Sequence, residues 1–170
     1  NAKTDIVIII KTIKKEIIET ISVKNTTQNR VSCHDYKCDD FIRVLQVEGT
    51  KLSKYLSLYQ ESGAHALFQS NMPDEFNVIE FEKLLEPHKD VLLEWALTGK
   101  HDNKNLIDPN KQISSYLLIN KSGNIRFIDF TSYMSELYLR SKLSYGLPLS
   151  WTYPSKQRGV RIQLKLPILM

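Results

Sequence analysis

One stretch of the sequence constrains the fold more than any other: SYLLINKSGNIRFIDF, from Ser115 to Phe130. Two apolar runs flank the polar string NKSG, whose glycine suits a tight turn. This pattern is typical of two neighbouring antiparallel strands, so we expect a β-hairpin here. Any fold for the chain must therefore contain a sheet in this region.

Upstream of this hairpin, apolar residues recur at the spacing of amphipathic helices. The string VEGTKLSKYLSLYQESG predicts one helix that ends at Gly63, a typical C-terminal cap. A second helical region opens at Pro73, is interrupted at Pro87, and ends at Gly99. The apolar face of the first helix consists of Leu52, Tyr55, Leu56 and Tyr59. Strands and helices together indicate an α+β fold.

The first 47 residues are harder to assign. The β-branched run from Asp5 to Lys11 predicts a strand, whereas the isoleucines that follow fall near helical spacing and predict a helix over 12–23. The strings RVSCHDY and DFIRVLQV then predict two strands of a second hairpin.

At 170 residues the chain is long enough for one domain with a substantial core and short for two, so we expect a single domain over 1–170. Its first residue is Asn, which suggests a fragment or a processed product. The most apolar run, Ile6 to Ile10, is too short to span a bilayer, so no membrane partner is expected.

The formal net charge of +4 is spread over interspersed acidic and basic residues. A nucleic-acid interface needs a concentrated basic face, so this distribution favours a solvated surface, and nucleic acid is not the expected partner. A small basic α+β domain that binds nucleic acid is kept as the alternative.

Two cysteines, Cys33 and Cys38, occur in the string CHDYKC. With His34 and Asp35 they could suggest a metal site, but the string lacks the second ligand pair of a structural zinc site. We therefore expect free thiols in a reducing compartment.

The order of these pieces resembles the protein-kinase superfamily, and within it the very short kinases that enteric bacterial pathogens inject into host cells by type III secretion. The resemblance runs from about Glu16 to Tyr138. It implies a minimal kinase-like α+β fold, with a reduced N-terminal lobe of a helix and a hairpin over 1–47, a hinge, and a reduced helical C-terminal lobe over 48–170.

Within this resemblance, Asp129 begins the string DFT, which is similar to the kinase DFG motif and implies that Asp129 binds Mg²⁺. Asp108, in the string IDPN, is similar to the catalytic-loop Asp, and Asn110 would be a second metal ligand. The alternatives are an incidental Asp in an ordinary hairpin for Asp129 and a turn residue before a proline for Asp108.

The resemblance also implies a nucleotide site. Lys11 resembles the phosphate-positioning Lys, Glu19 or Glu16 its carboxylate partner, and the backbone near Gln46 and Val47 the hinge that binds adenine. An exposed Glu–Lys pair is the ordinary alternative for the first two. The first 48 residues contain no glycine, so the glycine-rich phosphate loop is absent, and no His-Arg-Asp triplet or usual metal-binding Asn is evident.

The resemblance implies two functions. The chain would be a Ser/Thr protein kinase that uses ATP and Mg²⁺, with Asp108 orienting the substrate hydroxyl. Alternatively it would be a pseudokinase that binds a host protein, such as a ubiquitin-conjugating enzyme carrying ubiquitin. In either case it would be a virulence effector secreted by a bacterium into the host cytoplasm.

Overall fold

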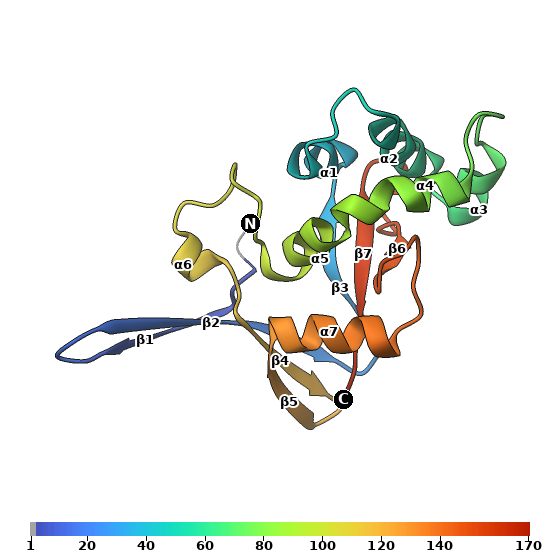
Figure 1. The fold of residues 1–170 in the computed structure, drawn as a ribbon. Coiled ribbons are helices and arrows are strands. Elements are labelled where there is room, and N and C mark those ends of the chain that lie inside the picture. The colour runs from blue at the N-terminus through green and yellow to red at the C-terminus, as the bar shows by residue number, and fades with distance from the viewer. Residues whose placement is uncertain (1–2) are drawn as a thin grey trace.

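The computed structural model describes residues 3–170 and contains two β-sheets (Figure 1). The first sheet has the strand order β1-β2-β4-β5, in which β1 and β2 are antiparallel, β2 and β4 parallel, and β4 and β5 antiparallel. Its strands are β1 (Ile6–Lys11), β2 (Glu16–Thr26), β4 (Tyr116–Lys121) and β5 (Asn124–Asp129). We call it sheet A.

The second sheet, sheet B, is antiparallel with the order β3-β7-β6. Its strands are β3 (Arg30–Tyr36), β7 (Ile162–Pro167) and β6 (Ser150–Thr152). The ladder between β3 and β7 shifts register between Ser32 and His34, which leaves Cys33 as the extra residue of a β-bulge. A short turn after β2 leads directly into β3, so the two sheets are joined at this point.

The helices are α1 (Cys38–Leu45), α2 (Lys51–Ser62), α3 (His65–Ser70), α4 (Val78–Leu85), the 3₁₀ turn η1 (Glu86–His88), α5 (Lys89–Thr98), α6 (Pro109–Gln112) and α7 (Phe130–Arg140). Helices α1 to α5 gather around sheet B and enclose an aromatic core, whereas α6 lies beside β2 and α7 beside β5 of sheet A (Figure 1). Fully buried rings of the core include Phe41, Tyr55, Tyr59, Phe68, Phe81 and Trp95. No helix among residues 3–170 is long and apolar enough to cross a membrane.

The β1–β2 hairpin extends away from the rest of the molecule (Figure 1). Every residue of β1 is exposed, including the isoleucines at its centre. The outer face of sheet A continues this apolar surface onto β5, where Ile125 is 71% and Phe127 is 55% exposed. Its inner face is covered, because Leu117 and Ile119 of β4 are fully buried.

Several predictions of secondary structure are confirmed. The hairpin expected from Ser115 to Phe130 is β4–β5, in which Tyr116 lies opposite Asp129. Helix α2 begins at the N-cap Thr50 and ends at Gly63, which has a φ of 62°. The second helical region is α4, η1 and α5; it ends at Gly99 as expected but begins at Val78 rather than at Pro73. The α+β class, the strand near Ile6–Lys11 and the strand RVSCHDY are confirmed as well.

The helix expected over 12–23 is wrong, because most of this segment is the strand β2. A tight turn, in which Thr12 N donates to Lys15 O at 2.8 Å, folds the chain back along β1. The isoleucines happen to fall near helical spacing, but β-branched side chains favour a strand when a partner strand is available.

The strand expected in DFIRVLQV is also wrong, because this segment lies mostly in α1. Asp39 and Asp40 occupy the first turn, where they interact favourably with the helix dipole. Phe41, Val44 and Leu45 then lie on the buried face at helical spacing. The expected order of a helix over 12–23 followed by a hairpin is therefore wrong: among residues 3–47 the hairpin β1–β2 comes first, then β3, and the helix α1 follows them.

Candidate functional site

A carboxylate, a hydroxyl and an ammonium meet at the base of the β1–β2 hairpin. Asp5 precedes β1, and its Oδ2 accepts hydrogen bonds from Val23 N at 2.6 Å and Ser22 Oγ at 3.3 Å. Lys24 Nζ in turn donates to Ser22 Oγ at 2.9 Å. We call Asp5, Ser22 and Lys24 the Asp5 cluster. Asp5 is exposed, Ser22 is fully buried and Lys24 is half-buried.

The backbone and a layer of hydroxyls hold the Asp5 cluster in place. Asp5 N donates to Ile21 O at 2.9 Å, which fixes Asp5 against β2. The buried Thr20 donates to Ile113 O at 2.7 Å and accepts from Ser115 N at 2.9 Å. Thr4, next to Asp5, lies 3.1 Å from Ser114 between hydroxyl oxygens. The segment that carries Asp5 is thus fixed from two sides.

A second lysine approaches the same region from the chain's beginning. Lys3 Nζ donates to the carbonyl of Cys33 in β3 and lies 5.5 Å from the centre of the Tyr36 ring. Burial, with a smaller contribution from the nearby Lys24, lowers the pKa of Lys3 to about 8. The region therefore holds two ammonium groups and one exposed carboxylate.

The chemistry of the Asp5 cluster fits a hard divalent cation. Carboxylate and hydroxyl oxygens are the ligands that Mg²⁺ accepts, and it keeps several waters when the protein supplies few ligands. Among the described residues no hydrogen bond is accepted by Asp5 Oδ1, so this oxygen is available to an ion. Residues 3–170 contain no group of three or more His, Cys, Asp or Glu that could hold a metal. Within the Asp5 cluster Asp5 supplies the only carboxylate, so ion binding there would depend on it.

The residues expected to carry kinase chemistry lie apart from the Asp5 cluster. Asp129 is the N-cap of α7 and accepts from Ser132 N at 2.9 Å, a bond that holds the pKa of Asp129 below its usual range. Asp108 precedes α6 and pairs with Lys111 at 3.0 Å. Asn110 is exposed on α6. Asp129 and Asn110 line different surface pockets.

The residues expected to bind the nucleotide are also dispersed. Lys11 pairs with Glu16 at 3.3 Å across the end of the β1–β2 hairpin, where both are exposed. Glu19 is half-buried on β2. Gln46 is the C-cap of α1 with a φ of 57°, and Val47 is buried in the core. This segment is a helix end rather than a hinge between lobes.

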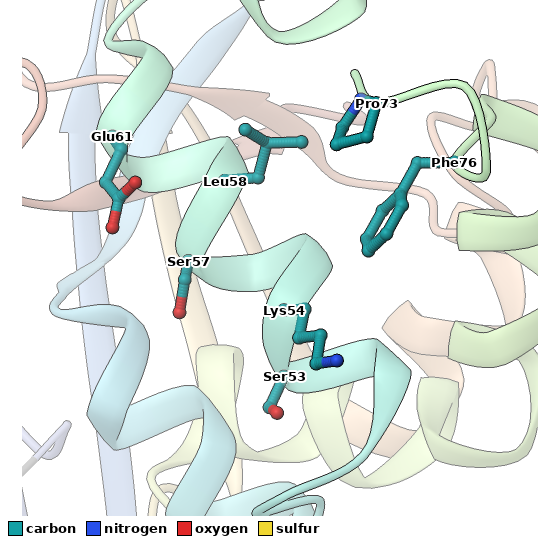
Figure 2. A pocket seen from close by; sticks show the side chains of 7 residues that line it. All are labelled: Ser53, Lys54, Ser57, Leu58, Glu61, Pro73 and Phe76. Atoms are coloured by element: carbon teal, nitrogen blue, oxygen red, sulfur yellow. The ribbon is translucent and has the colours of Figure 1, made fainter. Parts of the chain in front are cut away.

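A separate pocket of about 330 Å³ lies on the outer side of α2 (Figure 2). Its lining combines the side chains of Ser53, Lys54, Ser57, Leu58 and Glu61 from the helix with Pro73 and Phe76 from a following loop. No residue of the Asp5 cluster lines it. Its lysine, Lys54, and its carboxylate, Glu61, lie two helical turns apart on α2, whereas hydrogen bonds join the groups of the Asp5 cluster directly. The Asp5 cluster is therefore the stronger candidate site.

Sequence reasoning missed the Asp5 cluster because it assigned β2 to a helix. Residues two positions apart lie on different sides of a helix but on the same face of a strand. Ser22 and Lys24 are such a pair. An Asp directly before an apolar strand, followed by this Ser-x-Lys pattern on the partner strand, is the signal that a hairpin interpretation would have found.

Comparison with known proteins identifies the class. A family model described as "Restriction endonuclease MspI" matches residues 1–166 of the chain, which is nearly its whole length. The chain belongs to the MspI family of restriction endonucleases.

Individual relatives agree with this family. The Type II restriction enzyme BsuFI of Bacillus subtilis is 30% identical over 164 residues, which are 96% of this chain and 40% of that enzyme. A crystal structure of restriction endonuclease MspI in complex with its cognate DNA matches 96% of this chain and 63% of its own, with a TM-score of 0.78 and 18% identity. The chain thus spans less than half of the first relative and less than two thirds of the second.

The family membership corrects the kinase interpretation. The resemblance to type III effector kinases is wrong, and the expected ATP, kinase or pseudokinase activity, ubiquitin-conjugating partner, virulence role and secretion into a host cell are wrong with it. The roles expected for Asp108, Asn110, Lys11 and Gln46 were based on this resemblance and are no longer supported by it. The statement that nucleic acid is not a partner is also wrong, and the alternative of a basic α+β domain that binds nucleic acid fits better.

Proposed function

We propose that this chain is the catalytic part of a Type II restriction endonuclease that hydrolyses phosphodiester bonds of double-stranded DNA. The observation that supports the proposal most is the Asp5 cluster, which combines an exposed carboxylate with an ammonium held 2.9 Å from a shared hydroxyl. Relatives that are restriction endonucleases give the substrate class.

The residues divide the chemistry between them. Asp5 would hold a divalent cation such as Mg²⁺, with waters completing its shell, and Ser22 would orient the Asp5 carboxylate; the cation when bound supplies neutralisation of phosphate oxygens and activation of a water. Lys24 would place its ammonium against the scissile phosphate and stabilise the extra negative charge of the transition state. The water gives up a proton to solvent as its oxygen bonds to phosphorus, the bond from phosphorus to one sugar oxygen breaks, and that oxygen takes up a proton from solvent.

Sheet B supplies a surface that suits DNA. In β7, the buried Ile162, Leu164 and Leu166 alternate with the half-buried Gln163 and Lys165. The register places Ser32 and Ser150 on either side of Lys165, and Thr152 beside Gln163. Hydroxyl, amide and ammonium groups of this kind contact phosphates and base edges in protein–DNA complexes. This polar face starts a few residues after Lys24.

Cleavage of plasmid DNA tests the proposal. The wild-type chain should cut supercoiled DNA when Mg²⁺ is present and stop when EDTA removes the metal. Asp5→Asn and Lys24→Met should each lower the rate by about 100-fold or more, because each removes charge stabilisation from the transition state. Asp108→Asn, a carboxylate outside the cluster, is the matched control and should cut at the wild-type rate.

Two results would contradict the proposal. One is a wild-type chain that binds duplex DNA but never cuts it in Mg²⁺ or Mn²⁺. The other is an Asp5→Asn variant that cuts as fast as wild type, which would show that the nuclease activity belongs to another site or to a contaminant.

A further inference from the structure

Lys3 is the one described side chain that links the segment before β1 to sheet B through an ammonium group. Its Nζ donates to the carbonyl of Cys33, while its backbone N donates to Gln112 O at 3.3 Å. Its side chain also packs closely on Gly99, because a Cβ built there would lie 3.0 Å from Lys3 Cγ. Three parts of the fold therefore meet at this residue.

The β-bulge explains why a lysine is needed at this point. Cys33 has no partner residue on β7, since the register passes from Ser32 to His34. A buried carbonyl without a donor is costly, and the Lys3 ammonium supplies one. Burying an ammonium is costly as well, so its presence here is not explained by stability alone.

Each of three consecutive residues is fixed to a different element. Lys3 is fixed to β3, Thr4 to Ser114 in the segment before β4, and Asp5 to β2. Because Asp5 comes two residues after Lys3, the position of Lys3 limits the directions open to the backbone that carries the Asp5 carboxylate. Cys33 follows Ser32, which lies on the polar face of sheet B.

We propose that Lys3 is a positioning residue that couples sheet B to the Asp5 cluster and sets the orientation of the Asp5 carboxylate. The expected effect of Lys3 on the cleavage rate rests on the proposed function. Its expected effect on ion binding rests only on the orientation of the Asp5 carboxylate. The Lys3 side chain does not touch the substrate in this account; it acts through Asp5.

Comparison of two lysine-to-methionine variants tests the inference. Methionine keeps most of the aliphatic side chain and removes the ammonium. Lys51, on α2, is the control: like Lys3 it donates to a carbonyl, that of Glu75 at 2.8 Å, and lies 5.0 Å from the centre of an aromatic ring, that of Phe76. It also pairs with Glu80 at 2.8 Å, so Lys51→Met removes at least as much as Lys3→Met at a place away from the Asp5 cluster. Lys3→Met should weaken Mn²⁺ binding measured by calorimetry, and lower the single-turnover cleavage rate, by about 10- to 100-fold each, as losses of supporting interactions around metal ligands do. Lys51→Met should change neither.

Two further measurements separate positioning from general stability. The affinity of Lys3→Met for duplex DNA in Ca²⁺ should stay within about twofold of wild type, since no DNA contact is removed. Its melting temperature should fall only modestly, because the Cys33 carbonyl loses its donor while removal of a buried charge offsets part of that cost. Lys3→Arg, which keeps a charged donor, should recover most of the Mn²⁺ affinity.

The outcomes that would overturn the inference are distinct. The inference is overturned if Lys3→Met binds Mn²⁺ with wild-type affinity. It is also overturned if Lys3→Met and Lys3→Arg lose Mn²⁺ affinity equally. If Lys3→Met does not fold, Lys3→Gln takes its place. Wild-type Mn²⁺ affinity in Lys3→Gln overturns the inference. An affinity between that of wild type and that of Asp5→Asn supports it. A wild-type chain that binds Mn²⁺ through Asp5 but does not cut DNA contradicts the proposed function while leaving this comparison intact.

Discussion

His34 shows how a single residue can limit the conditions under which the fold is stable. It is 2% exposed, both of its ring nitrogens lack a hydrogen-bond partner among the described residues, and it packs against Tyr36, Phe41 and Trp95. Burial holds the pKa of His34 well below its ordinary value, and the nearby Lys3 acts in the same direction. His34 is therefore neutral in the folded state.

This predicts a loss of stability on the acid side of neutrality. Below pH about 6.5 the unfolded chain protonates His34 while the folded chain does not, so the free energy of unfolding falls as the pH falls. His34→Phe should lose less stability than wild type between pH 7.5 and pH 5, measured by urea denaturation. His88→Phe, at a half-buried position before α5, is the control and should follow the wild-type pH dependence. Equal acid sensitivity of His34→Phe and wild type would contradict the assignment.

At the scale of elements, β2 decides whether the site can be found from the sequence. Its apolar residues satisfy helical spacing, and a local pattern cannot distinguish a helix from a strand whose partner is unknown. The pairing Ile9↔Ile18 with β1 settles the question in the structure. Helix α2 and the β4–β5 hairpin were predictable because their Gly63 and Gly123 terminate them locally.

Gly63 and Gly123 allow a matched prediction about these two elements. Both have positive φ, 62° and 89°, but a Cβ at Gly63 would also lie 3.2 Å from Gly159 N, whereas nothing lies within 4 Å at Gly123. Gly123→Ala should cost about 1 kcal/mol of unfolding free energy from backbone strain. Gly63→Ala should cost more, because α2 must also move away from the 157–160 loop. Equal losses in chemical denaturation would contradict this packing.

At the scale of the whole molecule, sheet A is covered on one face only. Ile125 and Phe127 on β5 are exposed on the outer face, and the β1 isoleucines extend the apolar surface along the hairpin. Exposed apolar patches of this extent promote association. The sequence could not predict this, because the parallel pairing of β2 with β4 joins residues far apart in the chain. The pairing of β2 with β4 joins the β1–β2 and β4–β5 hairpins into one sheet.

Because this face is exposed, a substitution on it should reduce self-association of the chain without changing its stability. Ile125→Thr should lower binding of a hydrophobic dye and reduce light scattering at high protein concentration, because it removes a side chain that is 71% exposed within the patch. Ile107→Thr removes a 93% exposed isoleucine outside the patch and should have little effect. Both variants should keep the wild-type melting temperature. A similar effect of the two substitutions would show that the patch is not what drives association.

The central claim is that Asp5, rather than any other carboxylate of the chain, holds the divalent cation used in DNA cleavage. The most direct measurement is the anomalous diffraction of Mn²⁺ in a crystal of the chain. We expect a peak within about 2.5 Å of an Asp5 carboxylate oxygen, the distance range of hard cations to oxygen ligands. A peak at Asp129 or Asp108 with none at Asp5 would contradict it.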